Sequence, residues 1–159
     1  MIQQKIIQRQ ELEKKLAYWR FMESKIVFTN GCFDILHRGH IEYLAKAANL
    51  GDVLLVGLNT DRSVKQLKGD SRPLQDGYSR ALCLASLRFV DRVIFFDEET
   101  PYELIQYIQP HILVKGSEYK EKDIVGGDIV KQNGGKIATI DMIKGYSTSD
   151  IISRIKKMP

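Results

Sequence analysis

Cysteine is scarce in this sequence, whose 159 residues include 2 Cys, Cys32 and Cys83. A disulfide framework needs several cysteines, and a zinc site needs them in close pairs or together with histidines at set spacings. The sequence therefore argues against a disulfide-stabilised domain and against a cysteine-bound zinc centre.

Long hydrophobic runs are also missing, since no apolar stretch reaches the roughly 20 residues that cross a bilayer. The N-terminal stretch, MIQQKIIQRQELEKK, lacks the basic, apolar and small-residue order of a signal peptide. We therefore expect a cytoplasmic protein with no membrane partner.

Charge of one sign is not concentrated in any segment. The 24 Lys and Arg residues exceed the 20 Asp and Glu residues, which gives a net charge of +4 and favours anionic substrates. No basic run interleaved with aromatic residues is present, so we expect no nucleic-acid partner.

The length suits one domain with a substantial core. Apolar residues at irregular helical spacing predict a helix over residues 3–21. Residues 1–24 are interpreted as an N-terminal helical arm and residues 25–159 as the main domain. The arm is expected to pack on this domain or on a second copy of the chain.

β-rich apolar runs alternate with helical patterns along the main domain. Strands are predicted over residues 25–29, 52–59, 92–96, 111–114 and 136–140, and helices over 41–48, 61–67, 78–90, 100–108, 123–132 and 147–157. This alternation predicts an α/β fold, a single doubly wound Rossmann-like domain with a five-stranded parallel sheet.

Polar residues gather where the predicted strands end, in residues 29–40, 59–61, 115–118 and 142–149. Parallel strands place their carboxyl ends at one edge of the sheet, and ligands of doubly wound sheets bind beyond that edge. We therefore expect these four segments to form one site.

The turn before the first helix of the main domain carries His37, Gly39 and His40. A helix N-terminus presents unpaired N–H groups and the positive end of a dipole, and both suit phosphate. Gly39 permits close approach, and each imidazole can donate a hydrogen bond to an anionic group. The alternative is that a histidine here only caps or packs the helix.

The segment GCFDILHRGH resembles the signature of the nucleotidyltransferase superfamily that carries a [His/Thr]-x-Gly-His motif. Together with LGDVLLVGLNTDRSVKQLKGDSRP, LVKGSEY, NGG and YSTSDII, it most closely resembles the heptose 1-phosphate adenylyltransferases. The resemblance extends from Lys25 to Lys156.

The resemblance implies transfer of AMP from ATP to D-glycero-β-D-manno-heptose 1-phosphate, giving ADP-heptose and pyrophosphate by direct in-line attack. The implied catalytic residues are His37 and His40, which contact the α- and β-phosphates, and Lys68, which closes over the phosphates. Mg²⁺ is implied by the triphosphate, held mostly by substrate oxygens and water, with no dedicated metal-binding residues.

Nucleotide-binding residues are expected at the strand ends and at the Ser/Thr-rich start of the last helix. They are Thr29, Asn30, Gly31, Cys32, Phe33, Gly39, Asn59, Asp61, Arg80, Lys115, Gly116, Tyr146, Ser147, Thr148 and Ser149. For Arg80 the signal is a cation opposing the helix dipole. For Ser147, Thr148 and Ser149 the alternative is an ordinary helix cap.

Asp34 and Arg72 are predicted to bind the sugar phosphate. The alternative for Asp34 is a turn-forming carboxylate that accepts backbone N–H bonds, and the alternative for Arg72 is a solvated surface loop. Cys32 is interpreted as a small residue beside a tight turn rather than as a nucleophile.

Two other functions stay open. The first is a cytidylyltransferase for glycerol 3-phosphate or a similar alcohol phosphate, although Met142 stands where those enzymes carry an arginine. The second is a nucleotide-binding module without turnover. The resemblance further implies a homodimer and a separate heptose kinase that supplies the substrate.

Overall fold

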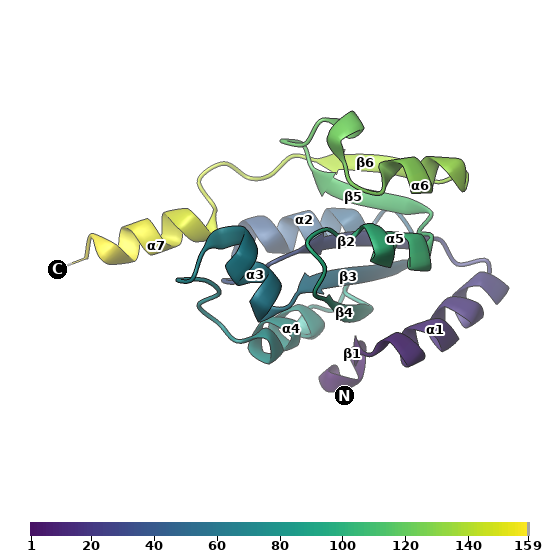
Figure 1. Cartoon of the computed structure of the whole chain (residues 1–159), viewed down its shortest axis with the longest axis horizontal. Helices are drawn as coiled ribbons and strands as arrows, with labels where there is room; N and C mark the ends of the chain where they lie inside the picture. Colours follow the sequence, from purple (N-terminus) through teal and green to yellow (C-terminus); the bar gives the residue numbers. More distant parts are fainter. Residues whose placement is uncertain (159) are drawn as a thin grey trace.

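A computed structural model describes residues 1–158; Pro159, the last residue of the predicted main domain, lies outside the described residues. One parallel sheet runs through the centre in the order β1-β4-β3-β2-β5-β6 (Figure 1). The strands are β1 (Ile6–Ile7), β2 (Ile26–Gly31), β3 (Val53–Asn59), β4 (Arg92–Phe96), β5 (Ile112–Gly116) and β6 (Lys136–Ile140). The predicted doubly wound, Rossmann-like fold is confirmed.

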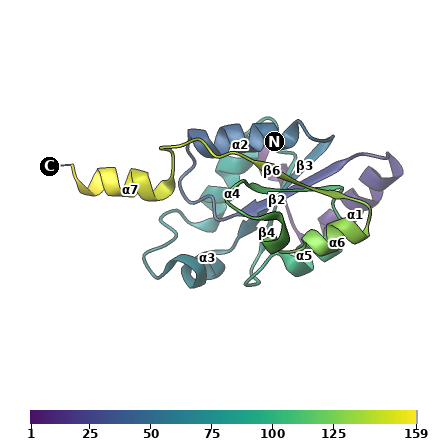
Figure 2. The ribbon, with the colours of Figure 1, turned by 90° about the horizontal axis from the view of Figure 1, so that it is seen from above.

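Helices cover both faces of the sheet (Figure 2). They are α1 (Arg9–Phe21), α2 (Arg38–Ala48), α3 (Asp61–Lys68), α4 (Gly77–Ser86), α5 (Tyr102–Ile108), α6 (Gly127–Gln132) and α7 (Thr148–Lys156), with short 3₁₀ turns η1 (Ile2–Lys5) and η2 (Glu121–Asp123). Alternate strand residues point to opposite faces. Phe28 therefore packs in the layer of α1, α5 and α6, and Val27 packs in the layer of α2 and α4.

The strand count is six rather than the predicted five, because part of the N-terminal arm joins the sheet. Ile6 and Ile7, predicted to be helical, pair in parallel with Val93 and Ile94 of β4. Two β-branched residues suit the open edge of β4, and Ile7 is buried there at 4% exposure. The helix of the arm begins only at Arg9.

Helix α1 belongs to the same core as the strands. Its buried side chains Leu12, Leu16 and Trp19 lie in one cluster with Phe28 and Leu55 of the sheet. The sequence predicts that the arm packs on its own domain or on a second copy of the chain. The structure shows it packed on its own domain.

The chain switches direction across the sheet beside β2, which pairs with β3 on one side and β5 on the other. A crevice forms at such a point, because the connections leave in opposite directions. The turn after β2 leads into α2, so the His37–His40 segment opens onto this crevice.

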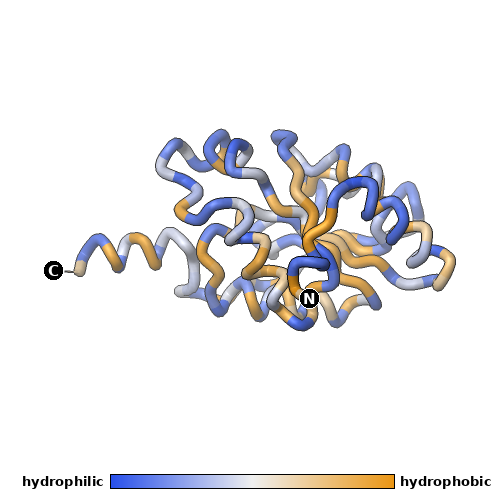
Figure 3. The backbone as a smooth tube through the Cα atoms, turned by 90° about the horizontal axis from the view of Figure 1, so that it is seen from below, coloured by the Kyte–Doolittle hydropathy of each residue, from blue (hydrophilic) through white to orange (hydrophobic). Residues whose placement is uncertain are grey.

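Helix α7 projects away from the rest of the molecule (Figures 1 and 2). None of its residues is buried, and its hydropathy alternates along the tube in Figure 3. Among residues 1–158, no helix combines the length and apolar character needed to cross a membrane.

Candidate active site

A cavity of about 430 Å³ lies at the carboxyl ends of β2, β3 and β5. Thirteen of the twenty predicted site residues line it: Asn30, Gly31, Cys32, Phe33, Asp34, His40, Asn59, Lys68, Arg72, Lys115, Gly116, Thr148 and Ser149. The other seven, Thr29, His37, Gly39, Asp61, Arg80, Tyr146 and Ser147, are not among its lining residues. The four polar segments therefore converge as the strand order requires.

His37 and His40 form a stacked pair at the start of α2. Their ring centroids are 3.7 Å apart with an interplanar angle of 20°, and Phe33 meets His40 edge-on at 5.1 Å. His37 is the N-cap of α2, since its Nδ1 accepts the backbone N–H of His40 at 3.4 Å. His37 therefore caps the helix, as the alternative interpretation stated. The contact of His37 with phosphate stays a prediction.

Both imidazoles are biased toward the neutral form. Burial, helped by neighbouring His37, lowers the pKa of His40 to about 4, and burial lowers the pKa of His37. Because Nδ1 of His37 accepts a hydrogen bond, its proton is assigned to Nε2, which remains a donor. The pair can therefore donate to a ligand without carrying positive charge beforehand.

Gly39 allows two segments to approach closely. A Cβ at this position would lie 3.1 Å from the His37 ring and 3.2 Å from the carbonyl oxygen of Tyr146. The glycine therefore brings the start of α2 against the segment that leads into α7, as the sequence predicted for a close approach.

Asp34 organises the loop between α3 and α4. Its buried carboxylate accepts the backbone N–H groups of Leu74 and Gln75 and the Nε–H of Arg72 at 2.5 Å. Burial alone would raise the pKa of Asp34, but these hydrogen bonds outweigh it and hold the pKa below its usual value. The turn-forming alternative is thus seen, and a sugar contact of Asp34 stays a prediction.

Arg80 lies behind the wall of the cavity with 1% of its surface exposed. Its terminal nitrogens donate to the carbonyl oxygens of Cys32 and Asn59 at 2.6 and 2.8 Å and to the Asp61 carboxylate at 2.6 Å. The guanidinium thereby ties the ends of β2 and β3 to the start of α3. The signal that suggested a phosphate ligand is accounted for by these protein acceptors.

Lys115 extends from the end of β5 to β2, where its Nζ donates to the Asn30 side-chain oxygen. Burial lowers the pKa of Lys115 to about 8, and the Glu118 carboxylate opposes this shift. The sequence predicts nucleotide binding by Lys115 and Gly116, and the structure places both residues in the lining of the cavity.

The first turn of α7 closes one end of the cavity. Ser147 caps the helix, its Oγ accepting the N–H of Asp150 at 3.0 Å. Thr148 and Ser149 line the cavity, and half-exposed Tyr146 lies 5.5 Å from the Arg38 guanidinium. The Ser/Thr-rich segment is therefore both a helix cap and a wall of the site.

Comparison with known proteins agrees with this geometry. The family described as cytidylyltransferase-like matches residues 28–154, which extend from within β2 through most of α7. The chain belongs to the cytidylyltransferase-like family. Cytidylyltransferases are nucleotidyltransferases, so the family membership confirms the predicted enzyme class.

Curated relatives of this cytidylyltransferase-like chain are longer proteins. The chain is 56% identical over 144 residues to the bifunctional protein HldE of Campylobacter jejuni subsp. doylei, covering 91% of this chain and 30% of that protein. It is 50% identical over 154 residues to HldE of Wolinella succinogenes, covering 97% and 32%. The chain thus spans about a third of the length of these relatives.

Two solved structures share the fold. The lipopolysaccharide core biosynthesis protein of Thermoplasma volcanium has a TM-score of 0.61 and 28% identity, covering 78% of this chain and 99% of that one. A pantoate-beta-alanine ligase of Francisella tularensis has a TM-score of 0.57 and 19% identity, covering 95% and 76%, and is a likeness of fold alone.

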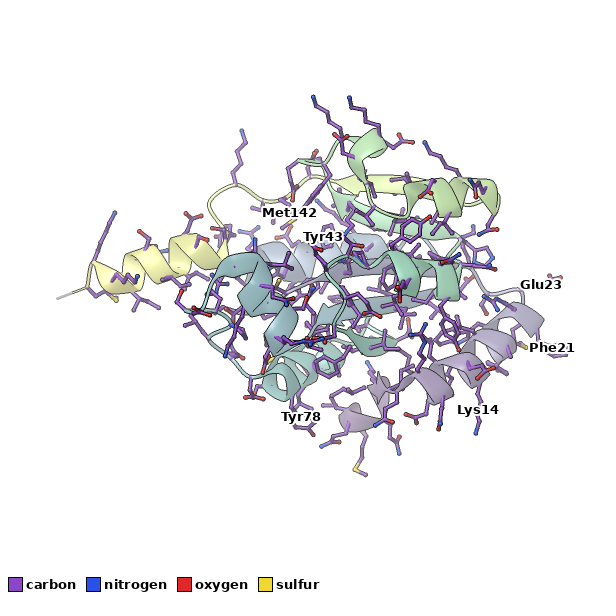
Figure 4. All side chains as sticks on the ribbon, in the orientation of Figure 1. Lys14, Phe21, Glu23, Tyr43, Tyr78 and Met142 are labelled. Atoms are coloured by element: carbon purple, nitrogen blue, oxygen red, sulfur yellow. The ribbon has the colours of Figure 1, made fainter. Side chains whose placement is uncertain are left out.

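Five residues that the sequence did not assign also line the cavity of this cytidylyltransferase-like domain: Tyr43, Leu67, Glu118, Tyr119 and Met142. Tyr43 and Met142, labelled in Figure 4, reach it from α2 and from the segment after β6. Tyr43 follows His40 by three residues, so helical spacing could have found it. The other four residues lie in loops or next to a loop. The sequence pattern does not define the course of these loops.

The carboxylates around the cavity do not form a metal cage. Within residues 1–158 no three His, Cys, Asp or Glu side chains are grouped as metal ligands. Asp34 is engaged by the loop, which leaves Glu118 as the other carboxylate of the wall. Within residues 1–158 these carboxylates do not fit a resident Mg²⁺ site.

Proposed function

We propose that the chain transfers AMP from ATP to D-glycero-β-D-manno-heptose 1-phosphate, giving ADP-heptose and pyrophosphate. The observation that carries the proposal is the single cavity formed by His40, Lys68 and the first turn of α7 at the sheet's switch point. The motifs that resemble the heptose 1-phosphate adenylyltransferases supply these walls. The HldE relatives support the same reading through their sequence identity.

The acceptor phosphate attacks the α-phosphorus of ATP, and the bond to the β-phosphate breaks as pyrophosphate leaves with its electron pair. No covalent enzyme intermediate is needed, because the acceptor oxygen is already anionic. The enzyme therefore acts by positioning the reactants and by stabilising charge as it grows on the phosphates.

Three sets of donors face that charge. The imidazoles of His37 and His40 act as neutral hydrogen-bond donors beside the N-terminus of α2. Lys68 supplies a cation from the end of α3, and the hydroxyls of Thr148 and Ser149 stand at the N-terminus of α7. Asp34 acts indirectly, because it fixes the loop that carries Arg72.

The test is pyrophosphate release by the purified chain with ATP or CTP, Mg²⁺ and a panel of sugar and alcohol phosphates. Release with ATP and heptose 1-phosphate supports the proposal. His40→Ala and Lys68→Met are expected to lower kcat by about 100- to 1,000-fold, as for loss of one preorganised donor. Lys65→Met is the matched control, since Lys65 is on the same helix but outside the cavity lining.

The second candidate function is cytidylyl transfer to glycerol phosphate, which the family description favours. Met142 opposes it, because the cavity has a thioether where those cytidylyltransferases carry an arginine. Activity with CTP and glycerol phosphate, but not with ATP and heptose 1-phosphate, would replace the first proposal with this one. A homodimer and a separate heptose kinase stay predictions.

A further inference from the structure

Lys115 is a cation whose charge has no close partner in the structure. The Nζ donates to the Asn30 side-chain oxygen, which belongs to a neutral amide. Among the described residues no carboxylate lies within 4 Å of this nitrogen, because none of the ion pairs includes Lys115. A neutral amide oxygen does not neutralise the charge of a half-buried ammonium group, so this charge is only partly compensated.

The placement of Lys115 separates it from the groups already assigned to the nucleotide phosphates. Those groups come from the starts of α2 and α7 and from the end of α3. Lys115 belongs to β5, and its side chain donates a hydrogen bond to Asn30 of β2. The two strands that border the switch point therefore hold this ammonium group. Its position is set by rigid strands rather than by a loop.

We infer that the Lys115 ammonium binds the phosphate of the acceptor sugar, an assignment that rests on the proposed adenylyl transfer. In that reaction two phosphate groups must come into contact despite their like charges. The triphosphate has the imidazoles, Lys68 and two helix N-termini, whereas the attacking phosphate needs a cation of its own. Lys115 lines the same cavity and is available for it.

Burial favours this role. The pKa of Lys115 near 8 means that losing water has weakened the charged form. A phosphate dianion beside Nζ would restore the balance and keep the ammonium protonated through the transfer. Lys115 then gives up no proton: the acceptor oxygen bonds to the α-phosphorus while pyrophosphate departs.

The neighbouring side chains support an acceptor rather than a nucleotide phosphate. Tyr119 lies with its ring centroid 5.9 Å from Nζ, and the Glu118 carboxylate is a further lining group. A carboxylate would repel a triphosphate but can accept hydrogen bonds from sugar hydroxyls. The segment 115–119 therefore offers a cation for the phosphate and an acceptor for the sugar.

The test compares Lys115→Met and Lys115→Gln with Lys120→Met, at an exposed lysine that directly follows this segment and is outside the cavity lining. The expected result is at least a tenfold rise in the acceptor KM for both Lys115 variants, with ATP affinity within twofold of wild type. Lys115→Arg should restore part of the loss. The thermal midpoint of each variant serves as the check of folding.

Two outcomes overturn the inference: an unchanged acceptor KM, or a loss of ATP affinity as large as the loss for the acceptor. A separate binding arm uses inorganic phosphate with the protein saturated by a non-hydrolysable ATP analogue. Weaker phosphate binding in both Lys115 variants, but not in Lys120→Met, supports the assignment even if wild type uses no heptose phosphate. Equal phosphate binding in all variants contradicts it.

Discussion

The stacked imidazoles of His37 and His40 have a structural role at the start of α2, and the proposed function adds a chemical role to it. Capping and burial fix the rings, and the same burial keeps them neutral. A neutral ring can donate a hydrogen bond while avoiding repulsion from Lys68 and Arg72 across the cavity.

The low pKa of His40 predicts an acid-sensitive fold. The unfolded chain binds a proton near pH 6.5 and the folded one near pH 4, so the free energy of unfolding decreases as pH falls through this window. The contribution of His40 is at most about 3 kcal/mol. Denaturant titrations at pH 7 and pH 4.5 should show a smaller loss for His40→Gln than for wild type.

If the free energy of unfolding falls as much in His40→Gln as in wild type between pH 7 and pH 4.5, other groups cause the acid sensitivity. His37→Gln provides a comparison, because His37 is also shifted downward by burial.

Arg80 predicts a second residue-level effect, on stability. Replacing it by Met leaves the carbonyl oxygens of Cys32 and Asn59 without their donor and should lower the free energy of unfolding by about 2–4 kcal/mol. Urea denaturation measures this loss. The exposed Arg88→Met is the control and should change stability by less than about 0.5 kcal/mol. An Arg80→Met variant as stable as wild type would show that these hydrogen bonds make no net contribution to the free energy of unfolding.

The motif residues could be predicted from the sequence, whereas their partners could not. His37, Gly39 and His40 are recognisable because they lie within four consecutive positions between a strand and a helix. The partners of Arg80 lie 19 to 48 residues away in sequence, and no local pattern encodes them. The same holds for Asp34, whose carboxylate is used by a loop about 40 residues further on.

At the scale of elements, strands with continuous apolar runs were predicted well. The predicted strands at 92–96 and 136–140 match β4 and β6 to the residue. The two-residue β1 was missed because its conformation depends on the open edge of β4, not on its own sequence pattern. The helix predicted over 123–132, with an interruption at Gly126 and Gly127, is shortened to α6, which starts after Gly126 with its φ of +80°.

The edge strand predicts a stability effect at Ile7. Its side chain is 4% exposed in the core formed with α1, so Ile7→Ala should cost about 2–4 kcal/mol of unfolding free energy. Ile2→Ala, at a residue 45% exposed in η1, should have little effect. Equal effects of the two substitutions in thermal and urea denaturation would argue against the packed β1.

Helix α7 predicts a difference in dynamics. A nine-residue helix without a buried side chain gains little from tertiary packing, and isolated helices of this length are marginal. Its amides should exchange with solvent much faster than those of β2 and β3. A non-hydrolysable ATP analogue should slow the exchange at 148–150, because the N-terminus of α7 borders the cavity.

Ser147→Ala removes the N-cap of α7 and should speed the exchange of this helix while leaving the global unfolding free energy unchanged. Strong protection of α7 without nucleotide would contradict the expectation.

At the scale of the whole molecule, the switch point beside β2 brings together segments that are far apart in sequence. The parallel order of the strands places all their carboxyl ends at one edge, and the cavity lies there beside the switch point between β2 and β5. This convergence was predictable from the alternation of strands and helices. The projection of α7 away from the domain could not be predicted, because the sequence pattern does not define the path of the chain after β6.

Adenylyl transfer within this cavity can be followed through the α-phosphate of ATP. The purified chain is incubated with heptose 1-phosphate and ATP labelled with radioactive phosphorus at either the α- or the γ-position. Adenylyl transfer should place label in the sugar nucleotide from the α-position alone, and this label should be lost in His40→Ala. Label reaching the sugar product from the γ-position, or no labelled product while ATP is bound, would rule out adenylyl transfer to this acceptor.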